Sequence, residues 1–227
     1  MSSLQQFSST VKGKNDVARD VITLRLSKPE GFEFEPGQFI NLKIQREGEE
    51  KIRSYSILSS PCEDDLVIVI KLVEDGFASD HFKTLEEGDQ LHVIGPFGNF
   101  VLDKNTEDHH WMIAGGTGMA PFYSMIKTYL ETDQRFTLLF SAKTRKHLFL
   151  HDELQTIEKD NQNFTYHPTL TREDWGGKQG RVQNHLPQDV NGKVFYLCGL
   201  KDLVIETKEK LEKMNVKENN IKCERYT

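Results

Sequence analysis

The sequence predicts an antiparallel β-barrel followed by a doubly wound domain with a parallel β-sheet. Three observations carry this prediction. The first half holds short runs rich in β-branched and aromatic residues, separated by turns with Gly or Pro. The second half alternates between apolar strands and helices, which is typical of a parallel sheet. The polar stretch LDKNTED, residues 102–108, lies between the halves, so we place the domains at 1–104 and 105–227.

In the first domain, runs such as VITLRLS and LVIVIKLV have the composition of strands and end at turn signals such as EDGF and EEGD. One stretch, ASDHFKTLEEG, has a helical pattern instead. We expect strands at 21–27, 38–44, 54–58, 66–73 and 90–97, and a helix at 78–88.

In the second domain, each apolar run is followed by a helical pattern, and Pro121 suits the first turn of the first helix. The last helix, LVIETKEKLEKM, has apolar residues at helical spacing on one face. We expect strands at 111–116, 136–142, 164–171, 194–199 and 221–226, and helices at 121–131, 150–160, 180–186 and 201–215.

Charge and cysteine content exclude several classes. Residues 1–104 hold 12 basic against 18 acidic side chains and the rest 17 against 17, so all of the net charge of −6 lies in the first domain. No basic footprint for nucleic acid is present. The longest apolar run, residues 66–70, is too short to span a membrane. Three widely spaced cysteines suit neither a disulfide framework nor a metal cluster. We expect a cytoplasmic protein without a metal site.

The stretch AGGTGMAP, residues 114–121, follows an apolar strand and opens a helix. In that context Gly116 and Gly118 allow a sharp turn and let a phosphate approach the free N–H groups at the helix N-terminus. This predicts a dinucleotide site. The alternative is a tight strand-to-helix turn that binds nothing.

The next two strands refine this prediction. Sites selective for NAD place an acid near the ribose at the end of the second strand. Here the strand ends in Ser141, Ala142, Lys143, Thr144 and Arg145, so NADP is favoured, with NAD as the alternative. Cys198 and Gly199 end a later core strand, where ligands bind in such sheets. The simpler interpretations are solvated loop charges and a buried thiol that acts as a small apolar group.

The stretch RSYS, residues 53–56, holds residues that a strand does not need. A barrel beside a dinucleotide domain suggests a second cofactor that exchanges electrons with the nicotinamide, and a flavin is the natural candidate. Arg53 offers a cation for its phosphates, Tyr55 an aromatic plate for its ring, and Ser56 a hydrogen bond near its reactive nitrogen.

Six short motifs occur in one order along the chain: RSYS, GFAS (76–79), GPFG (95–98), AGGTGMAP, CGL (198–200) and the terminal ERY. In the order of these motifs, the chain resembles the ferredoxin–NADP reductase superfamily over essentially its whole length. The resemblance implies an antiparallel flavin-binding barrel followed by a pyridine-nucleotide domain. It also implies FAD as the flavin, with FMN less favoured, and NADP as the nucleotide.

The resemblance assigns roles to particular positions. Arg53 would pair with the flavin diphosphate, Gly76–Ser79 would offer it backbone N–H groups, and Tyr55 would stack on the ring. Cys198 and Glu224 would lie beside the nicotinamide, and Tyr226 would cover the flavin. The implied FAD-binding residues are Arg53, Ser54, Tyr55, Ser56, Ile70, Lys71, Gly76, Phe77, Ala78 and Ser79. The nucleotide-binding residues are Gly116, Thr117, Gly118, Ser141, Lys143, Thr171, Arg172, Cys198 and Gly199. The catalytic residues are Ser56, Cys198, Glu224 and Tyr226.

The implied activity is transfer of electrons from NAD(P)H through FAD to a separate acceptor, in the first place a small redox protein such as ferredoxin or flavodoxin. These carriers are acidic, so the acidic first domain would need a local basic patch of Lys12, Lys14, Arg46 and Lys51 to dock them. The alternatives are the reductase component of an oxygenase, a free-flavin or ferric reductase, and, from another class, a redox-responsive regulatory subunit.

Overall fold

A computed structural model describes residues 3–46 and 48–226 of the chain. The chain folds into two compact units. One unit comprises Met1–Leu102 with Tyr123–Thr128, and the other comprises Asp103–Phe122 with Tyr129–Thr227. The first change of unit lies close to the boundary that the polar stretch at 102–108 predicts.

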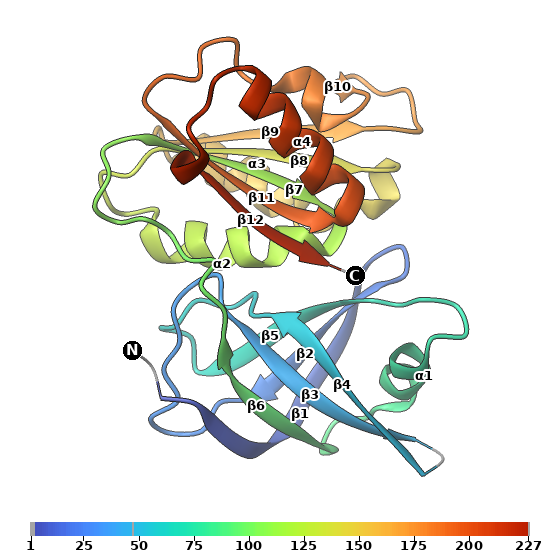
Figure 1. Ribbon diagram of the computed structural model, residues 1–227. Helices are drawn as coiled ribbons and strands as arrows, with labels where there is room; N and C mark the ends of the chain where they lie inside the picture. Colours follow the sequence, from blue (N-terminus) through green and yellow to red (C-terminus); the bar gives the residue numbers. More distant parts are fainter. Residues whose placement is uncertain (1–2, 47, 227) are drawn as a thin grey trace. The chain divides into compact units, whose positions relative to one another are not determined.

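The first unit is a curled antiparallel sheet, which confirms the predicted barrel class (Figure 1). Its strands lie in the order β4-β3-β6-β1-β2-β5. An isolated antiparallel bridge between Ile57 and Ile68 brings the end of the β4 segment against β5. The strands are β1 (Gln5–Ala18), β2 (Val21–Ser27), β3 (Phe39–Arg46), β4 (Glu49–Ser56), β5 (Asp65–Lys71) and β6 (Gln90–Phe97).

Alternation along these strands builds the core of the first unit. In β3, Ile40, Leu42 and Ile44 are fully buried and their neighbours are more exposed, as the two-residue period of a strand requires. Leu24 and Leu26 of β2 join the same core. Helix α1 (Phe77–Thr84) packs against it through the fully buried Phe82.

The strand β1 was not predicted, although it pairs with both β2 and β6. Its fourteen residues are mostly polar, and only Ser9 and Val11 are buried. The helix prediction was too long, because α1 ends at Thr84 rather than at residue 88. Leu85 takes an extended conformation there and buries its side chain.

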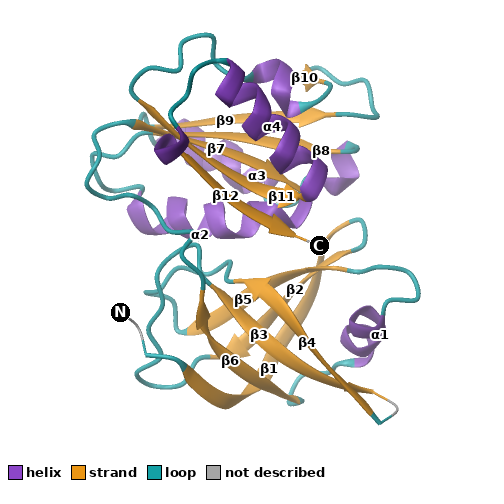
Figure 2. Cartoon of the chain, in the orientation of Figure 1, coloured by secondary structure: helices purple, strands orange, loops and turns teal. Residues whose placement is uncertain are grey.

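The second unit is a parallel sheet in the order β10-β9-β8-β7-β11-β12 (Figure 2). Helices lie on both of its faces, with α4 in front of the sheet and α3 behind it in this view, which confirms the predicted doubly wound class. The elements are β7 (His109–Gly115), β8 (Phe136–Ala142), α3 (His151–Asp160), β9 (Phe164–Leu170), β10 (Lys178–Gln179), β11 (Lys193–Leu200), α4 (Lys201–Lys213) and β12 (Ile221–Tyr226). Helix α2 (Ala120–Tyr129) begins and ends in this unit, and its residues Tyr123–Thr128 are counted with the first unit.

Its central strands are buried at consecutive positions, as strands covered on both faces should be. Examples are Met112–Ala114 in β7, Leu138–Phe140 in β8 and Phe195–Leu197 in β11. The predicted helix at 180–186 is only a short 3₁₀ turn, Val182–His185, and the short strand β10 was not predicted.

Two further findings concern the described residues only. Among residues 3–46 and 48–226, none of the helices combines the length and hydropathy that a membrane-spanning segment needs. The same residues contain no group of three or more His, Cys, Asp and Glu side chains placed to hold a metal ion.

Candidate functional site

In the first unit, the predicted flavin residues of RSYS occupy the last half of the sheet-edge strand β4. Arg53 is exposed, and its Nη1 donates to the carbonyl of the preceding Ile52 at 2.9 Å. Ser54 is also exposed and donates its hydroxyl to Asn41 at 2.7 Å. Ser56 is buried at the end of the strand, opposite Phe39. The strand thus offers one exposed cation and one buried hydroxyl.

Tyr55 lies between these two groups and is half-buried. Its ring meets Phe82 of α1 edge-on, with centroids 5.4 Å apart and planes at 84°. Burial raises the pKa of the phenol, and the charge of Arg53 opposes that rise. The tyrosine is therefore a neutral plate whose orientation depends on a core side chain.

Helix α1 begins at the predicted GFAS stretch. Gly76 is the N-cap residue, and no side chain of the described residues caps this end of the helix. The Ser79 hydroxyl lies near Gly76 and accepts the Val73 N–H at 2.8 Å. A Cβ on Gly76 would stand 2.9 Å from the Ser79 Oγ and 3.0 Å from the Val73 carbonyl, so glycine keeps this turn tight.

An uncapped helix N-terminus beside a glycine is chemically suited to an anionic group such as the FAD diphosphate. Arg53 adds a positive charge to the same unit. The first-unit residues therefore fit FAD.

The predicted flavin-binding residues Ile70 and Lys71 lie at the end of strand β5. Ile70 is buried in the core, so only its backbone is available to a ligand. The Lys71 ammonium donates to the Arg19 carbonyl and to Asp20, each at 3.2 Å. These contacts anchor the turn between β1 and β2.

In the second unit, the glycine loop has two distinct tasks. Gly116 has φ of +56° with open space around its Cβ position, so it supplies the sharp turn that the sequence predicts. Gly118 instead lies against β11, where a Cβ would stand 2.4 Å from the Cys198 carbonyl oxygen. Its missing side chain allows the loop to pack closely on the strand.

Two further glycines complete this close approach. Gly199 has φ of +149°, and its Cβ position lies 3.0 Å from the Gly115 carbonyl. A Cβ on Gly115 would meet Leu203 at 2.6 Å. Gly115 had no predicted role, and its place beside Gly116 in the motif was the available signal. The half-buried Thr117 sits within this loop, and its carbonyl accepts the Ala120 N–H.

Cys198, Glu224 and Tyr226 come together on the neighbouring strands β11 and β12. Cys198 is fully buried opposite Glu224, and its Sγ lies 3.9 Å from the Glu224 Oε1. Burial raises the pKa of the thiol well above its usual value, and the charge of Glu224 adds a smaller rise in the same direction. A hydrogen bond with the Tyr226 side chain lowers the pKa in part. The thiol is therefore neutral, and these three predicted residues form one cluster.

The predicted nucleotide-selecting residues gather at the carboxyl ends of β8 and β9. The Arg172 N–H donates to the Lys143 carbonyl at 2.9 Å, and the Thr171 N–H donates to the Ala142 carbonyl at 3.0 Å. Both cations are exposed. Ser141 is half-buried on β8, in register with Gly115. A pocket lies here, lined by residues 170–174, 179 and 180.

Glu173 of this pocket was not among the predicted site residues. Its Oε2 accepts the Arg145 N–H at 2.9 Å, which ties the loop after β9 to the loop after β8. The acid directly follows the predicted Thr171–Arg172 pair. Only the fold brings it to the other loop.

Comparisons with known proteins assign a cofactor-binding domain to each half of the chain. Residues 8–102 match the family model "Oxidoreductase FAD-binding domain", and residues 112–210 match "Oxidoreductase NAD-binding domain". The chain is therefore an oxidoreductase with an FAD-binding and an NAD-binding domain.

Among curated proteins, the chain is 31% identical to ferredoxin–NADP reductase B of Sorangium cellulosum, over 86% of each chain. It is also 31% identical to the phenol hydroxylase P5 protein of Acinetobacter pittii, over 98% of this chain and 66% of that one. Among solved structures, a cytochrome P450 reductase from Amycolatopsis matches with a TM-score of 0.92 and 26% identity, over 100% of this chain and 71% of that one. The chain belongs to the ferredoxin–NADP reductase superfamily.

Proposed function

We propose that this protein takes electrons from NADPH, holds them on FAD and passes them to a separate protein acceptor. The observation that supports the proposal is the presence, on one chain, of the FAD-binding and NAD-binding domains with fitting residues in each. The flavin, when bound, supplies the redox chemistry by accepting a hydride and releasing electrons. The protein supplies position and electrostatics.

The residues of the first unit would grip FAD. The N–H groups of Phe77 and Ala78 at the start of α1 hold the diphosphate, with Arg53 as its counter-charge. Tyr55 supports one face of the ring, and the buried Ser56 offers its hydroxyl to the ring edge. The residues of the second unit would orient the nucleotide, with the neutral Cys198 thiol and Glu224 beside the nicotinamide.

The choice of NADPH rests on Lys143 and Arg172. A backbone hydrogen bond joins these two residues, and both side chains are exposed. An added phosphate on the ribose favours two cations in such a place. The similar Sorangium cellulosum protein is named as an NADP reductase.

Two acceptor classes remain as proposals. A small acidic carrier, ferredoxin or flavodoxin, is the first candidate, in line with the name of the Sorangium cellulosum relative. An oxygenase component is the second, because the phenol hydroxylase protein matches 98% of this chain and the Amycolatopsis P450 reductase matches all of it. The acidic first domain favours the second candidate, since acidic partners repel each other.

The decisive experiment is anaerobic mixing of the purified yellow protein with NADPH and, separately, with NADH. Bleaching of the flavin absorbance within seconds is expected, and faster with NADPH. Absence of bleaching with both nucleotides would overturn the enzyme proposal and leave the regulatory subunit. A clear preference for NADH would overturn the NADPH assignment alone.

A second experiment separates the acceptors. Steady-state rates are measured with ferredoxin, flavodoxin, an oxygenase component and a ferric chelate at two ionic strengths. Electrostatic repulsion from an acidic carrier should make its KM fall as salt rises. A KM that instead rises with salt shows attraction, and it would refute the charge argument against ferredoxin.

A further inference from the structure

The four cations that would form a basic docking patch, Lys12, Lys14, Arg46 and Lys51, are all engaged within the first unit. Lys12 forms an ion pair with Asp65 at 2.5 Å. The other three all reach α1, although they come from the strands β1, β3 and β4.

Lys14 holds the C-terminal end of α1. Its Nζ donates to the carbonyls of Phe82, Lys83 and Leu85, at 3.3, 2.8 and 2.6 Å. The Thr84 hydroxyl donates to the His81 carbonyl at 2.8 Å. A positive charge at this end of a helix is favourable, because the carbonyl dipoles there are unpaired. Side chains thus cap the C-terminal end.

Arg46 and Lys51 act on the first turn of the same helix. Arg46 forms an ion pair with Asp80 at 2.7 Å, and Lys83 binds the other oxygen of that carboxylate at 3.0 Å. The hydrogen bond from Lys83 lowers the pKa of Asp80 most, and the hydrogen bond from Arg46 lowers it further. The ammonium of Lys51 lies 4.2 Å from the centre of the Phe77 ring.

The two ends of α1 therefore differ in their side-chain capping. Its C-terminal end is capped by Lys14, whereas within residues 3–46 and 48–226 no side chain caps its N-terminal end. Asp80 is the acid in the first turn, and its charge would repel a diphosphate there. Arg46 and Lys83 each pair with that carboxylate and offset its charge.

We infer that Lys14 and Arg46 are positioning residues for the flavin diphosphate, rather than parts of a docking surface. They fix α1 so that its N–H groups at Phe77 and Ala78 face the diphosphate and Asp80 does not. This inference rests on the proposed function, since it takes α1 as the diphosphate site.

The test compares two probes on the full-length protein freed of flavin. FAD carries the diphosphate and riboflavin does not, while both carry the same ring. The variants are Lys14→Met and Arg46→Met, with Lys14→Arg as the conservative rescue. Lys12→Met is the matched control, because Lys12 lies on the same strand as Lys14 but pairs with Asp65. Kd for each probe is measured by flavin fluorescence.

In Lys14→Met and Arg46→Met, the Kd for FAD should rise about tenfold relative to the Kd for riboflavin, as expected for one lost charge-assisted interaction. Lys14→Arg and Lys12→Met should keep the wild-type ratio. Partial unfolding raises both Kd values by one factor and leaves their ratio unchanged, so an unchanged ratio overturns the inference. A wild-type protein that binds riboflavin as tightly as FAD would instead overturn the proposed diphosphate site.

Discussion

The thiol of Cys198 and the carboxylate of Glu224 face each other across two parallel strands, with 3.9 Å between Sγ and Oε1. The strand β11 carries the thiol into the core, where it is fully buried. Burial and the neighbouring acid both raise the pKa of the thiol. Cys198 therefore enters the proposed reaction as a neutral, polarisable group and not as a nucleophilic thiolate.

This pKa shift predicts how stability depends on pH. In the unfolded chain the thiol ionises near its ordinary pKa of about 8.5, whereas in the folded protein it stays protonated at higher pH. The free energy of unfolding should hold its full value below about pH 8.5. Above that pH, the Cys198 contribution should fall by about 1.4 kcal/mol per pH unit, because the unfolded chain loses the proton first.

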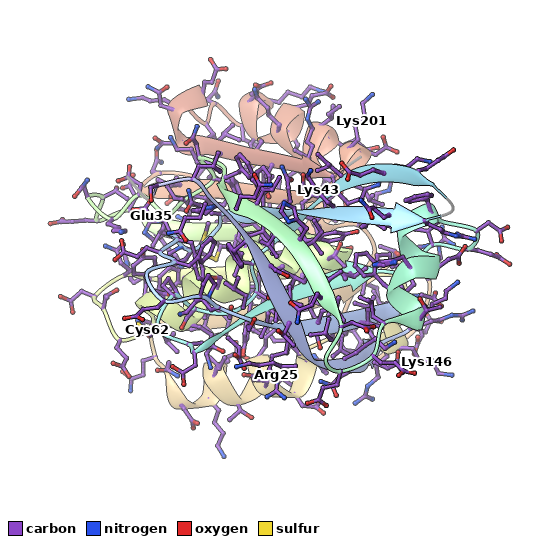
Figure 3. The ribbon with its side chains drawn as sticks, turned by 90° about the horizontal axis from the view of Figure 1, so that it is seen from below. Arg25, Glu35, Lys43, Cys62, Lys146 and Lys201 are labelled. Atoms are coloured by element: carbon purple, nitrogen blue, oxygen red, sulfur yellow. The ribbon has the colours of Figure 1, made fainter. Side chains whose placement is uncertain are left out.

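Urea unfolding at a series of pH values from neutral to alkaline checks this prediction. The variant Cys198→Ala should show a shallower alkaline decline than the wild type. Cys62→Ala is the control, since Cys62 is exposed (Figure 3) and should leave the decline unchanged. Equal declines in all three proteins would contradict the assignment.

The glycine loop predicts two different costs for the same substitution. Gly118→Ala places a Cβ 2.4 Å from the Cys198 carbonyl oxygen and 2.7 Å from the Gly199 Cα. These are backbone atoms that cannot turn away, so we expect a loss of about 3 kcal/mol in stability and a raised KM for NADPH. Gly116→Ala meets open space and should cost only about 1 kcal/mol through its positive φ.

Denaturant midpoints and NADPH kinetics of the two variants give the comparison. If Gly116→Ala proved the more destabilising, close packing against β11 would not be the role of Gly118. A raised KM in Gly116→Ala without loss of stability would indicate that Gly116, and not Gly118, lies next to the nucleotide.

Tyr55 predicts a difference between its ring and its hydroxyl. Tyr55→Phe keeps the ring that meets Phe82 edge-on, so stability and FAD retention should change little. Tyr55→Ala removes the ring and should cost about 2 kcal/mol as well as most of the bound flavin. Thermal unfolding and the flavin-to-protein absorbance ratio measure both effects. Loss of flavin in Tyr55→Phe would mean that the hydroxyl, not the ring, holds the cofactor.

Much of the fold follows from local pattern, because the buried strands of the second unit are short apolar runs between helices. The sequence did not predict strand β1, because apolar and polar side chains alternate only weakly along it. Only Ser9 and Val11 of this strand are buried. Pairing with β2 on one side and β6 on the other makes it a strand. Such pairing depends on residues far away in sequence, which no local pattern contains.

In the candidate site, too, some features follow from short motifs and others depend on contacts between distant residues. Cys198 and Glu224 could be named from short motifs, but their approach is set by the register of β11 against β12. The task of Gly118 could not be read from its motif, because the atoms it avoids belong to Cys198 and Gly199, about eighty residues later. The sequence suggested Lys14 only as part of a basic docking patch, and the structure places its ammonium on the carbonyls at the C-terminal end of α1.

The final prediction concerns the choice of nucleotide. Lys143 and Arg172 are joined by a backbone hydrogen bond, and both side chains are exposed beside the pocket at the ends of β8 and β9. Arg172→Gln or Lys143→Gln should lower kcat/KM for NADPH about tenfold, as the loss of one charged hydrogen bond implies. The value for NADH should stay within about twofold, because NADH lacks the phosphate that these cations would meet.

Lys146→Gln is the matched control, since Lys146 is an exposed cation of the same loop outside this pair, labelled in Figure 3. Competition by 2′-phospho-AMP against AMP gives a readout that does not depend on turnover. The two variants should lose the preference for 2′-phospho-AMP, whereas the control keeps it. Equal losses for NADPH and NADH would show that the cations hold the shared part of the dinucleotide. In that case Glu173, which accepts the Arg145 N–H between the same two loops, becomes the residue to test for ribose recognition.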